Sequence, residues 1–143
     1  MSEAKTEPKK PVRPLPRPDI YTKTTPFWEA ANEGKLLLQY CKDSGKYQWF
    51  PRAGSIHSGK RNIEWRQASG RGTVYSYTVS VAAWPGHEDR VPYICAYVEL
   101  EEGVRILANL FNVKGEDVKV GMPVKLTFER LSEKFNYPAF EPA

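Results

Sequence analysis

Two short turns in the first half of the chain have the spacing of metal-binding knuckles. Residues 41–45 read CKDSG and residues 55–59 read SIHSG. A zinc knuckle has the form Cys-x-x-Cys-Gly, and two such turns supply the four thiolates of a tetrahedral site. The corresponding positions here are Cys41, Ser44, Ser55 and Ser58. Because a neutral serine hydroxyl is a poor zinc ligand at pH 7, we expect the turns to persist and zinc to be absent.

A rewired metal site is the alternative for the same two turns. Asp43 and His57 are close to Cys41 in the sequence, and carboxylate, imidazole and thiolate all bind zinc. A fourth ligand is not evident. We therefore expect Cys41 to be a partly buried thiol, which behaves as a small hydrophobic residue.

Residues that could support independent catalysis are sparse. The chain has two histidines, His57 in the second turn and His87 beside Glu88 and Asp89 in a loop. Cys95 stands within an apolar run, where cysteine is usually a core residue rather than a nucleophile. An enzyme needs a nucleophile, a base and an orienting group. We expect no catalytic residues, and an isolated chain that is inactive.

Composition limits the compartment and the class of partner. The chain has 143 residues, 41% hydrophobic, which suits one domain with a small appendage. It has no run of 18 apolar residues and no apolar leader, so we expect a cytoplasmic protein with no membrane span. Two cysteines agree with a reducing compartment.

Most of the excess positive charge lies in the N-terminal tail. Residues 1–23 carry six basic and three acidic side chains, whereas residues 24–143 carry fifteen and fourteen. A nucleic-acid groove needs basic residues on the folded surface, so the net charge of +4 gives little support to nucleic-acid binding. Five prolines between residues 8 and 18 indicate an extended, flexible tail. It could be solvated or lie on a partner as a polyproline arm.

Residues 24–68 are predicted to form a helix and a degenerate zinc ribbon. Thr25 suits a helix N-cap, Pro26 the first turn and Gly34 the C-terminal cap. The ribbon strands are expected at 36–41, 46–50 and 62–67.

Residues 69–143 alternate with the period of β-strands. Strands are expected at 73–81, 93–100, 104–111 and 124–129, separated by Gly- and Pro-containing turns. We expect Thr73, Tyr75, Tyr77, Val79 and Val81 to share one face. The predicted fold is mainly β, a five-stranded OB-fold barrel beside the helix and ribbon.

The order of these motifs resembles one family. Its segments here are GRGTVYSYTV (70–79), PYICAYVELEEG (92–103), RILANL (105–110) and VGMPV (120–124), after an aromatic helix and two knuckles. The combination is similar to the acyl-CoA-associated OB-fold proteins with a rubredoxin-like zinc ribbon, domain-of-unknown-function family thirty-five. Its zinc ligands would map onto the four knuckle positions, of which only Cys41 matches.

The resemblance implies a non-catalytic accessory subunit of a thiolase-like enzyme. Such a subunit would form a hetero-oligomer, and would help bind or channel acyl-CoA while the partner supplies the nucleophile and base. No tightly bound cofactor is implied beyond this shared ligand.

Candidate ligand- and partner-binding residues are aromatic or basic. Trp84, Arg90 and Tyr93 cluster near a barrel loop, where OB-folds often bind ligands. Phe27 and Trp28 could close over a channel or dock on a partner. Arg52 and Lys60 could meet phosphate. Ordinary core packing or solvated charge is the alternative for each.

Single-stranded nucleic-acid binding is the competing function. OB-folds bind single strands by stacking bases on exposed aromatic residues in a basic groove. Tyr75, Tyr77 and Trp84 could serve in this way, although the nearly neutral residues 24–143 count against it.

Overall fold

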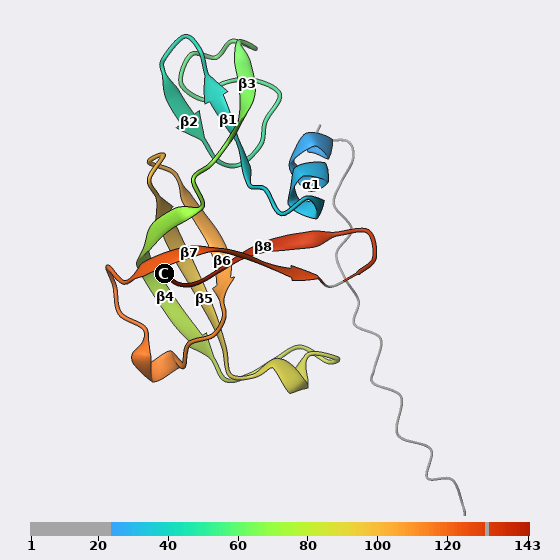
Figure 1. Ribbon diagram of the computed structural model, residues 1–143, viewed down its shortest axis with the longest axis vertical. Coiled ribbons are helices and arrows are strands. Elements are labelled where there is room, and N and C mark those ends of the chain that lie inside the picture. Colours follow the sequence, from blue (N-terminus) through green and yellow to red (C-terminus); the bar gives the residue numbers. More distant parts are fainter. Residues whose placement is uncertain (1–23, 131) are drawn as a thin grey trace, which may run out of the picture.

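The computed structural model describes residues 24–130 and 132–143, so the predicted tail lies outside the described residues. In this part of the chain, a small three-stranded sheet stands above a closed barrel, and a short α-helix lies beside both (Figure 1). The elements are α1 (Thr25–Asn32), β1 (Leu37–Cys41), β2 (Lys46–Gln48), β3 (Ile63–Gln67), β4 (Arg71–Ser80), η2 (Glu88–Arg90), β5 (Tyr93–Leu100), β6 (Arg105–Leu110), η3 (Gly115–Asp117), β7 (Pro123–Arg130) and β8 (Asn136–Pro142). No described helix is long and apolar enough to cross a bilayer.

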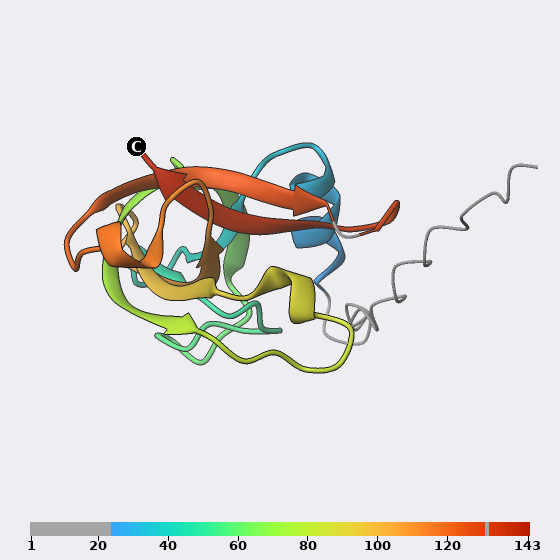
Figure 2. The same cartoon turned by 90° about the horizontal axis from the view of Figure 1, so that it is seen from below.

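The barrel closes in the strand order β4-β5-β6-β8-β7. Strands β6 and β8 run parallel, and the other neighbours, including the closing pair β4 and β7, run antiparallel. Seen from below, β7 and β8 form one wall with α1 behind them, and β4 lies on the opposite side (Figure 2). The predicted mainly β architecture with a five-stranded barrel is confirmed.

Strand β6 follows the predicted alternation closely. Val104, Ile106, Ala108 and Leu110 are all buried, as expected for one inward face. The facing residues of β5, from Ile94 to Leu100 at every second position, are buried as well. Period-two patterning therefore identified the inward face of β6, whereas β5 was expected only as a central strand that is apolar on both faces.

The predicted single face of β4 is wrong. A β-bulge between Val74 and Ser76 inserts an extra residue, which reverses the alternation. Val74 is buried against the core, Tyr75 is exposed, and beyond the bulge Tyr77 pairs with the buried Ala96. No strand was predicted at the position of β8, which contains two prolines and pairs mainly with β7.

Helix α1 starts and ends as its sequence suggests, with one shift. The N-cap position is Thr24 rather than Thr25, and its side chain makes no capping hydrogen bond. At the other end Gly34 adopts φ +77°, and the N–H of Lys35 donates to Ala30 O at 2.8 Å. This is a Schellman cap, which favours glycine at its left-handed position.

One hydrophobic core joins the three parts of the chain. Phe27 from α1 and the fully buried Leu36 and Leu38 belong to the same cluster as the barrel residues Ile106 and Phe140. At the start of β8, Asn136 Nδ2 donates to Ala31 O and the Asn136 N–H donates to Asn32 Oδ1, each at 3.0 Å, and these bonds tie the helix to the barrel. The three-stranded sheet is therefore fixed to the barrel by shared packing.

Gly72 provides a test of the barrel packing. A Cβ at this position would lie 2.5 Å from Glu99 O and 2.9 Å from Val98 Cγ1, both across the β4–β5 pair. We predict that Gly72→Ala lowers the free energy of unfolding by about 1–3 kcal/mol, because the strands must separate. Urea denaturation measures this, with the exposed neighbour Thr73→Ala as control; equal stability of the two variants would contradict the packing described.

Candidate interaction site and degenerate knuckles

The two knuckles keep the same backbone turn. The N–H of Gly45 donates to Cys41 O at 2.8 Å, and the N–H of Gly59 donates to Ser55 O at 3.0 Å. Both glycines adopt φ +70°, a conformation that costs other residues energy. The predicted turns are therefore present as a matched pair.

The three serines at the knuckle positions lie around the sulfur of Cys41, the fourth position. Cys41 is fully buried at the end of β1, and its Sγ lies 3.6 Å from Ser58 Oγ. Ser55 is buried too, and its Oγ accepts the backbone N–H groups of His57 at 3.0 Å and Ser58 at 3.2 Å. In the second knuckle, the backbone N–H groups that follow Ser55 are therefore satisfied by its hydroxyl oxygen.

Hydroxyl groups stabilise the ionised form of the sulfur. Hydrogen bonds from Ser44 and then Ser55 are the largest causes that lower the pKa of Cys41, and Ser58 adds to them. Burial opposes this by disfavouring the charged form. The net result lowers the pKa of Cys41 to about 6.

The alternative ligand set is occupied by other contacts. His57 Nε2 donates to Tyr47 O at 2.9 Å, and Asp43 Oδ1 accepts from Asn62 Nδ2 at 2.9 Å. Across residues 24–130 and 132–143, no group of three or more His, Cys, Asp or Glu side chains could hold a metal ion. One thiol and three hydroxyls do not fit zinc, which binds thiolate, imidazole and carboxylate.

Two buried glutamines, which the sequence analysis missed, fix the loop before the second knuckle. Gln48 Nε2 donates to Gln39 Oε1 at 2.7 Å and to Gly54 O at 3.1 Å, and Gln48 Oε1 accepts the N–H of Ile56 at 2.8 Å. Gln39 in turn binds both backbone groups of Arg52, donating to its carbonyl and accepting its N–H at 2.8 Å each. Both side chains therefore hydrogen-bond to each other and to backbone groups of the loop between β2 and β3.

The lowered pKa of Cys41 predicts a pH-dependent stability. A thiol whose folded-state pKa is below its unfolded value stabilises the fold above the unfolded pKa, near 9, and this contribution is lost as the pH falls through about 6. We expect the stability difference between wild type and Cys41→Ser to grow from pH 6 to pH 9. Urea denaturation across this range measures it, with Cys95→Ser as control; a difference independent of pH would contradict the ionised sulfur.

The glutamine pair predicts a cost for an apolar replacement. Gln48→Leu keeps the approximate volume but leaves the Ile56 N–H and the Gly54 carbonyl without partners. We expect a loss of about 2–3 kcal/mol in the free energy of unfolding, measured by urea denaturation. Gln67→Leu, at an exposed position in β3, is the control; if both changes cost the same, the network is not stabilising.

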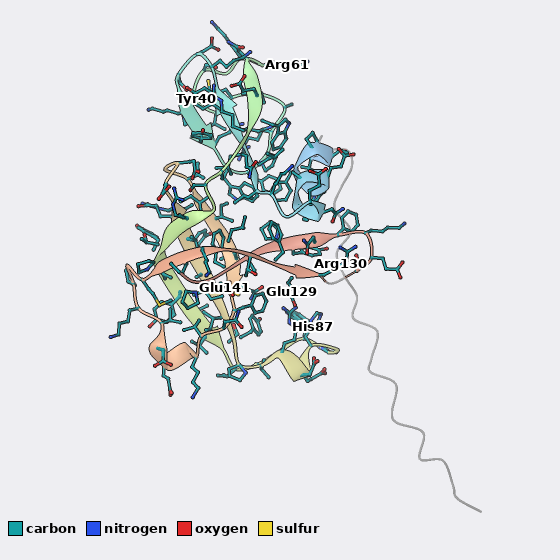
Figure 3. All side chains as sticks on the ribbon, viewed as in Figure 1. Tyr40, Arg61, His87, Glu129, Arg130 and Glu141 are labelled. Carbon is teal, nitrogen blue, oxygen red and sulfur yellow. The ribbon has the colours of Figure 1, made fainter. Side chains whose placement is uncertain are left out.

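Trp84, Arg90 and Tyr93 line a single cavity, as the sequence grouping suggested. The cavity has a volume of about 600 Å³ and is also lined by Ala83, Pro85, His87 and Asn109. Figure 3 shows His87 below Glu129, on the part of the barrel remote from the three-stranded sheet, which is marked by Tyr40 in β1 and by Arg61 in the loop before β3. Trp84 is 83% exposed, so its ring is available to a ligand or partner.

Arg90 is not a free phosphate ligand. Its Nη2 lies 2.7 Å from both carboxylate oxygens of Glu129, and both side chains are largely buried. The partner comes from β7, 39 residues away in the sequence, which is why local reading missed it. An anion at this cavity must compete with an internal ion pair.

A second, smaller cavity lies where α1, the three-stranded sheet and the barrel meet. It has a volume of about 290 Å³. Phe27 lines it, is 4% exposed and belongs to the core, which is the packing role that the sequence left open for it, and its contact with a partner stays a prediction. Trp28 is half-buried and makes edge contacts with the rings of Phe27, Phe135 and Tyr137. We define the junction surface as the exposed rim of this cavity, formed by Phe50 and Leu107, together with Trp28.

The remaining predicted residues lie apart from both cavities. Arg52 and Lys60 are exposed in the loop between β2 and β3, and neither lines the two cavities described. Cys95 is half-buried in β5, where Asn109 Nδ2 lies 3.7 Å from its sulfur. Tyr75 on the barrel exterior is covered by the guanidinium of Arg105 at 3.6 Å, and Arg105 also pairs with Glu99 at 2.8 Å.

Fold and knuckles together define an OB-fold protein with a rubredoxin-like ribbon. Family models match consecutive parts of the chain: the ChsH2 rubredoxin-like zinc ribbon domain at residues 28–63 and the ChsH2 C-terminal OB-fold domain at residues 65–129. A DUF35 domain-containing scaffold protein of Methanocaldococcus jannaschii is 38% identical over 109 residues, which are 74% of this chain and 77% of that protein. The chain belongs to the DUF35 family.

Two further relatives show how this chain compares with longer proteins and with a solved structure. A protein of Thermomonospora curvata named "Probable enoyl-CoA hydratase alpha subunit" is 34% identical over 135 residues, covering 94% of this chain and 42% of that protein. The chain therefore spans about two fifths of that relative. A chain in the structure named "Ltp2-ChsH2(DUF35) aldolase" is 31% identical with a TM-score of 0.76, covering 91% of this chain and 98% of that one.

Proposed function

We propose that this chain is a non-catalytic accessory subunit of a thiolase-superfamily enzyme that helps to bind or channel an acyl-CoA substrate. The partner would supply the nucleophile and base, and the two proteins would form a hetero-oligomer in the cytoplasm. The observation that carries the proposal is the junction surface, where Phe50 is 54% and Leu107 59% exposed beside the buried core residue Phe27. Exposed aromatic and aliphatic groups over a packed pocket are the usual anchors of protein interfaces.

The names of the relatives support an accessory role in acyl-CoA chemistry. One is a scaffold protein, and one is the alpha subunit of a probable enoyl-CoA hydratase. The solved structure is named as an aldolase, and its name joins Ltp2 with ChsH2. Two of these names are those of an enzyme subunit and of an aldolase, and the third is that of a scaffold. Among the described side chains, His57 lies in the second knuckle and His87 in the loop before η2, so the two histidines do not belong to one site.

The cavity of about 600 Å³ is the candidate contribution to the ligand. Its volume falls in the range of small-molecule sites. Trp84 offers an exposed ring on which an adenine could stack, and Tyr93 a phenol at the barrel end. Arg90 would act mainly by holding η2 to β7 through Glu129. A partner subunit could close this open cavity around the substrate.

Single-stranded nucleic-acid binding is the alternative. It is favoured by the exposed tyrosines Tyr75 and Tyr77 on the barrel. However, Arg105 over Tyr75 is already paired with Glu99, which reduces the positive charge available to phosphates. Nucleic-acid binding would weaken steeply with added salt, whereas docking through the junction surface would not.

Docking through the junction surface predicts a selective loss of partner binding. A thiolase-superfamily enzyme that copurifies with the chain should raise its thermal midpoint, because it binds only the folded state. We expect Phe50→Ser to weaken binding at least about tenfold, the effect of losing a buried aromatic anchor. Isothermal titration measures the affinity. Val120→Ser, at a 68% exposed residue outside this surface, is the control; equal affinities for both variants would contradict this docking site.

A further inference from the structure

The sulfur and the facing serine hydroxyl have the separation of two ligands that share one metal ion. For a tetrahedral site with Zn–S distances of about 2.3 Å, ligand atoms are separated by about 3.8 Å. The distance from Cys41 Sγ to Ser58 Oγ is 3.6 Å. At this separation a thiol and a hydroxyl can also bind each other directly. The same positions therefore suit either a metal or a hydrogen-bonded cluster, and the donor types decide which forms.

The donor types favour the hydrogen-bonded cluster. Ser58 Oγ lies 3.6 Å from the Cys41 sulfur, and the hydroxyls of Ser44 and Ser55 are near enough to lower the pKa of that thiol. Zinc sites are built from thiolate, imidazole and carboxylate ligands, so one sulfur and three neutral hydroxyls make a weak site. The oxygen of Ser55 is further engaged by two backbone N–H groups.

Other hydrogen bonds join the same two knuckles to their surroundings. The N–H of Lys42 donates to Asn62 O at 3.0 Å, and Asn62 Nδ2 donates to Asp43. In the second knuckle, Ile56 is bound by Gln48 and His57 binds Tyr47 O. The first knuckle is thus bound to the segment before β3, and the second knuckle to β2. A metal ion would normally provide this cross-link.

We propose that the ribbon of this chain folds without a metal, and that the cluster of Cys41 with Ser44, Ser55 and Ser58 replaces the zinc cross-link of its relatives. The inference is independent of the proposed partner. The buried Gln39–Gln48 pair and the core shared with the barrel supply the further stabilisation that a zinc ion gives elsewhere. The backbone frame of the zinc site remains, so sulfur at the three serine positions restores metal binding.

The full-length wild type and the variant Ser44→Cys/Ser55→Cys/Ser58→Cys test both parts. Each is purified from zinc-supplemented culture under reducing conditions, its zinc content is measured by plasma mass spectrometry, and its thermal midpoint is recorded with and without EDTA. We expect wild type to carry substoichiometric zinc and to keep its midpoint in EDTA. The variant should bind about one zinc per chain, give the absorption of tetrahedral thiolate sites with Co²⁺, and melt lower in EDTA.

Stoichiometric zinc in wild type, or a lower wild-type midpoint in EDTA, would overturn metal independence. A folded variant that takes up neither Zn²⁺ nor Co²⁺ would overturn the retained frame. Gln67→Cys, which adds a thiol at an exposed position of the same sheet, controls for non-specific binding of metal by cysteine. If the triple variant does not fold, the wild-type zinc content and chelator response still decide the first claim.

Discussion

The shared core between the helix, the small sheet and the barrel is the constraint on which the structure depends. A three-stranded sheet of this size buries too little apolar surface to be stable by itself, and small domains of this kind normally rely on metals or disulfides. Here Leu36 and Leu38 are fully buried against Phe27 and the barrel. Each such side chain contributes about 1.5–3 kcal/mol. The ribbon is therefore a part of the barrel's core rather than a separate module.

This arrangement connects stability with the proposed role. Because α1 and the sheet are held against β6 and β8, the apolar rim between them is presented on a fixed base (Figure 1). A surface whose supporting residues are already packed in the free protein has less conformational entropy to lose when a partner covers it. The hydrogen bonds of Gln39 and Gln48 stabilise the loop between β2 and β3, because they satisfy buried polar groups that would otherwise destabilise it. The barrel end with Trp84 stays open for a ligand or for the partner.

The sequence predicted local features well and long-range ones poorly. Alternation identified the inward face of β6, and the Cys-x-x-Ser-Gly and Ser-x-x-Ser-Gly spacing identified both knuckles, because each depends on neighbouring residues. The bulge after Val74 and the strand β8 were missed, since neither a bulge nor a proline-containing strand has a period-two signal. The Arg90–Glu129 pair and the buried glutamines depend on contacts across the fold. The division of the chain at residues 68 and 69 remains a prediction.

The most direct test of the central claim is to isolate the tagged chain from its native cell, separate its complexes by size-exclusion chromatography, and identify the proteins by mass spectrometry. Coelution with a thiolase-superfamily enzyme in a fixed ratio that survives high salt is the expected result, because salt screens charge–charge contacts and not apolar docking. Elution alone, or with nucleic acid that high salt removes, would contradict it and favour the single-strand-binding alternative.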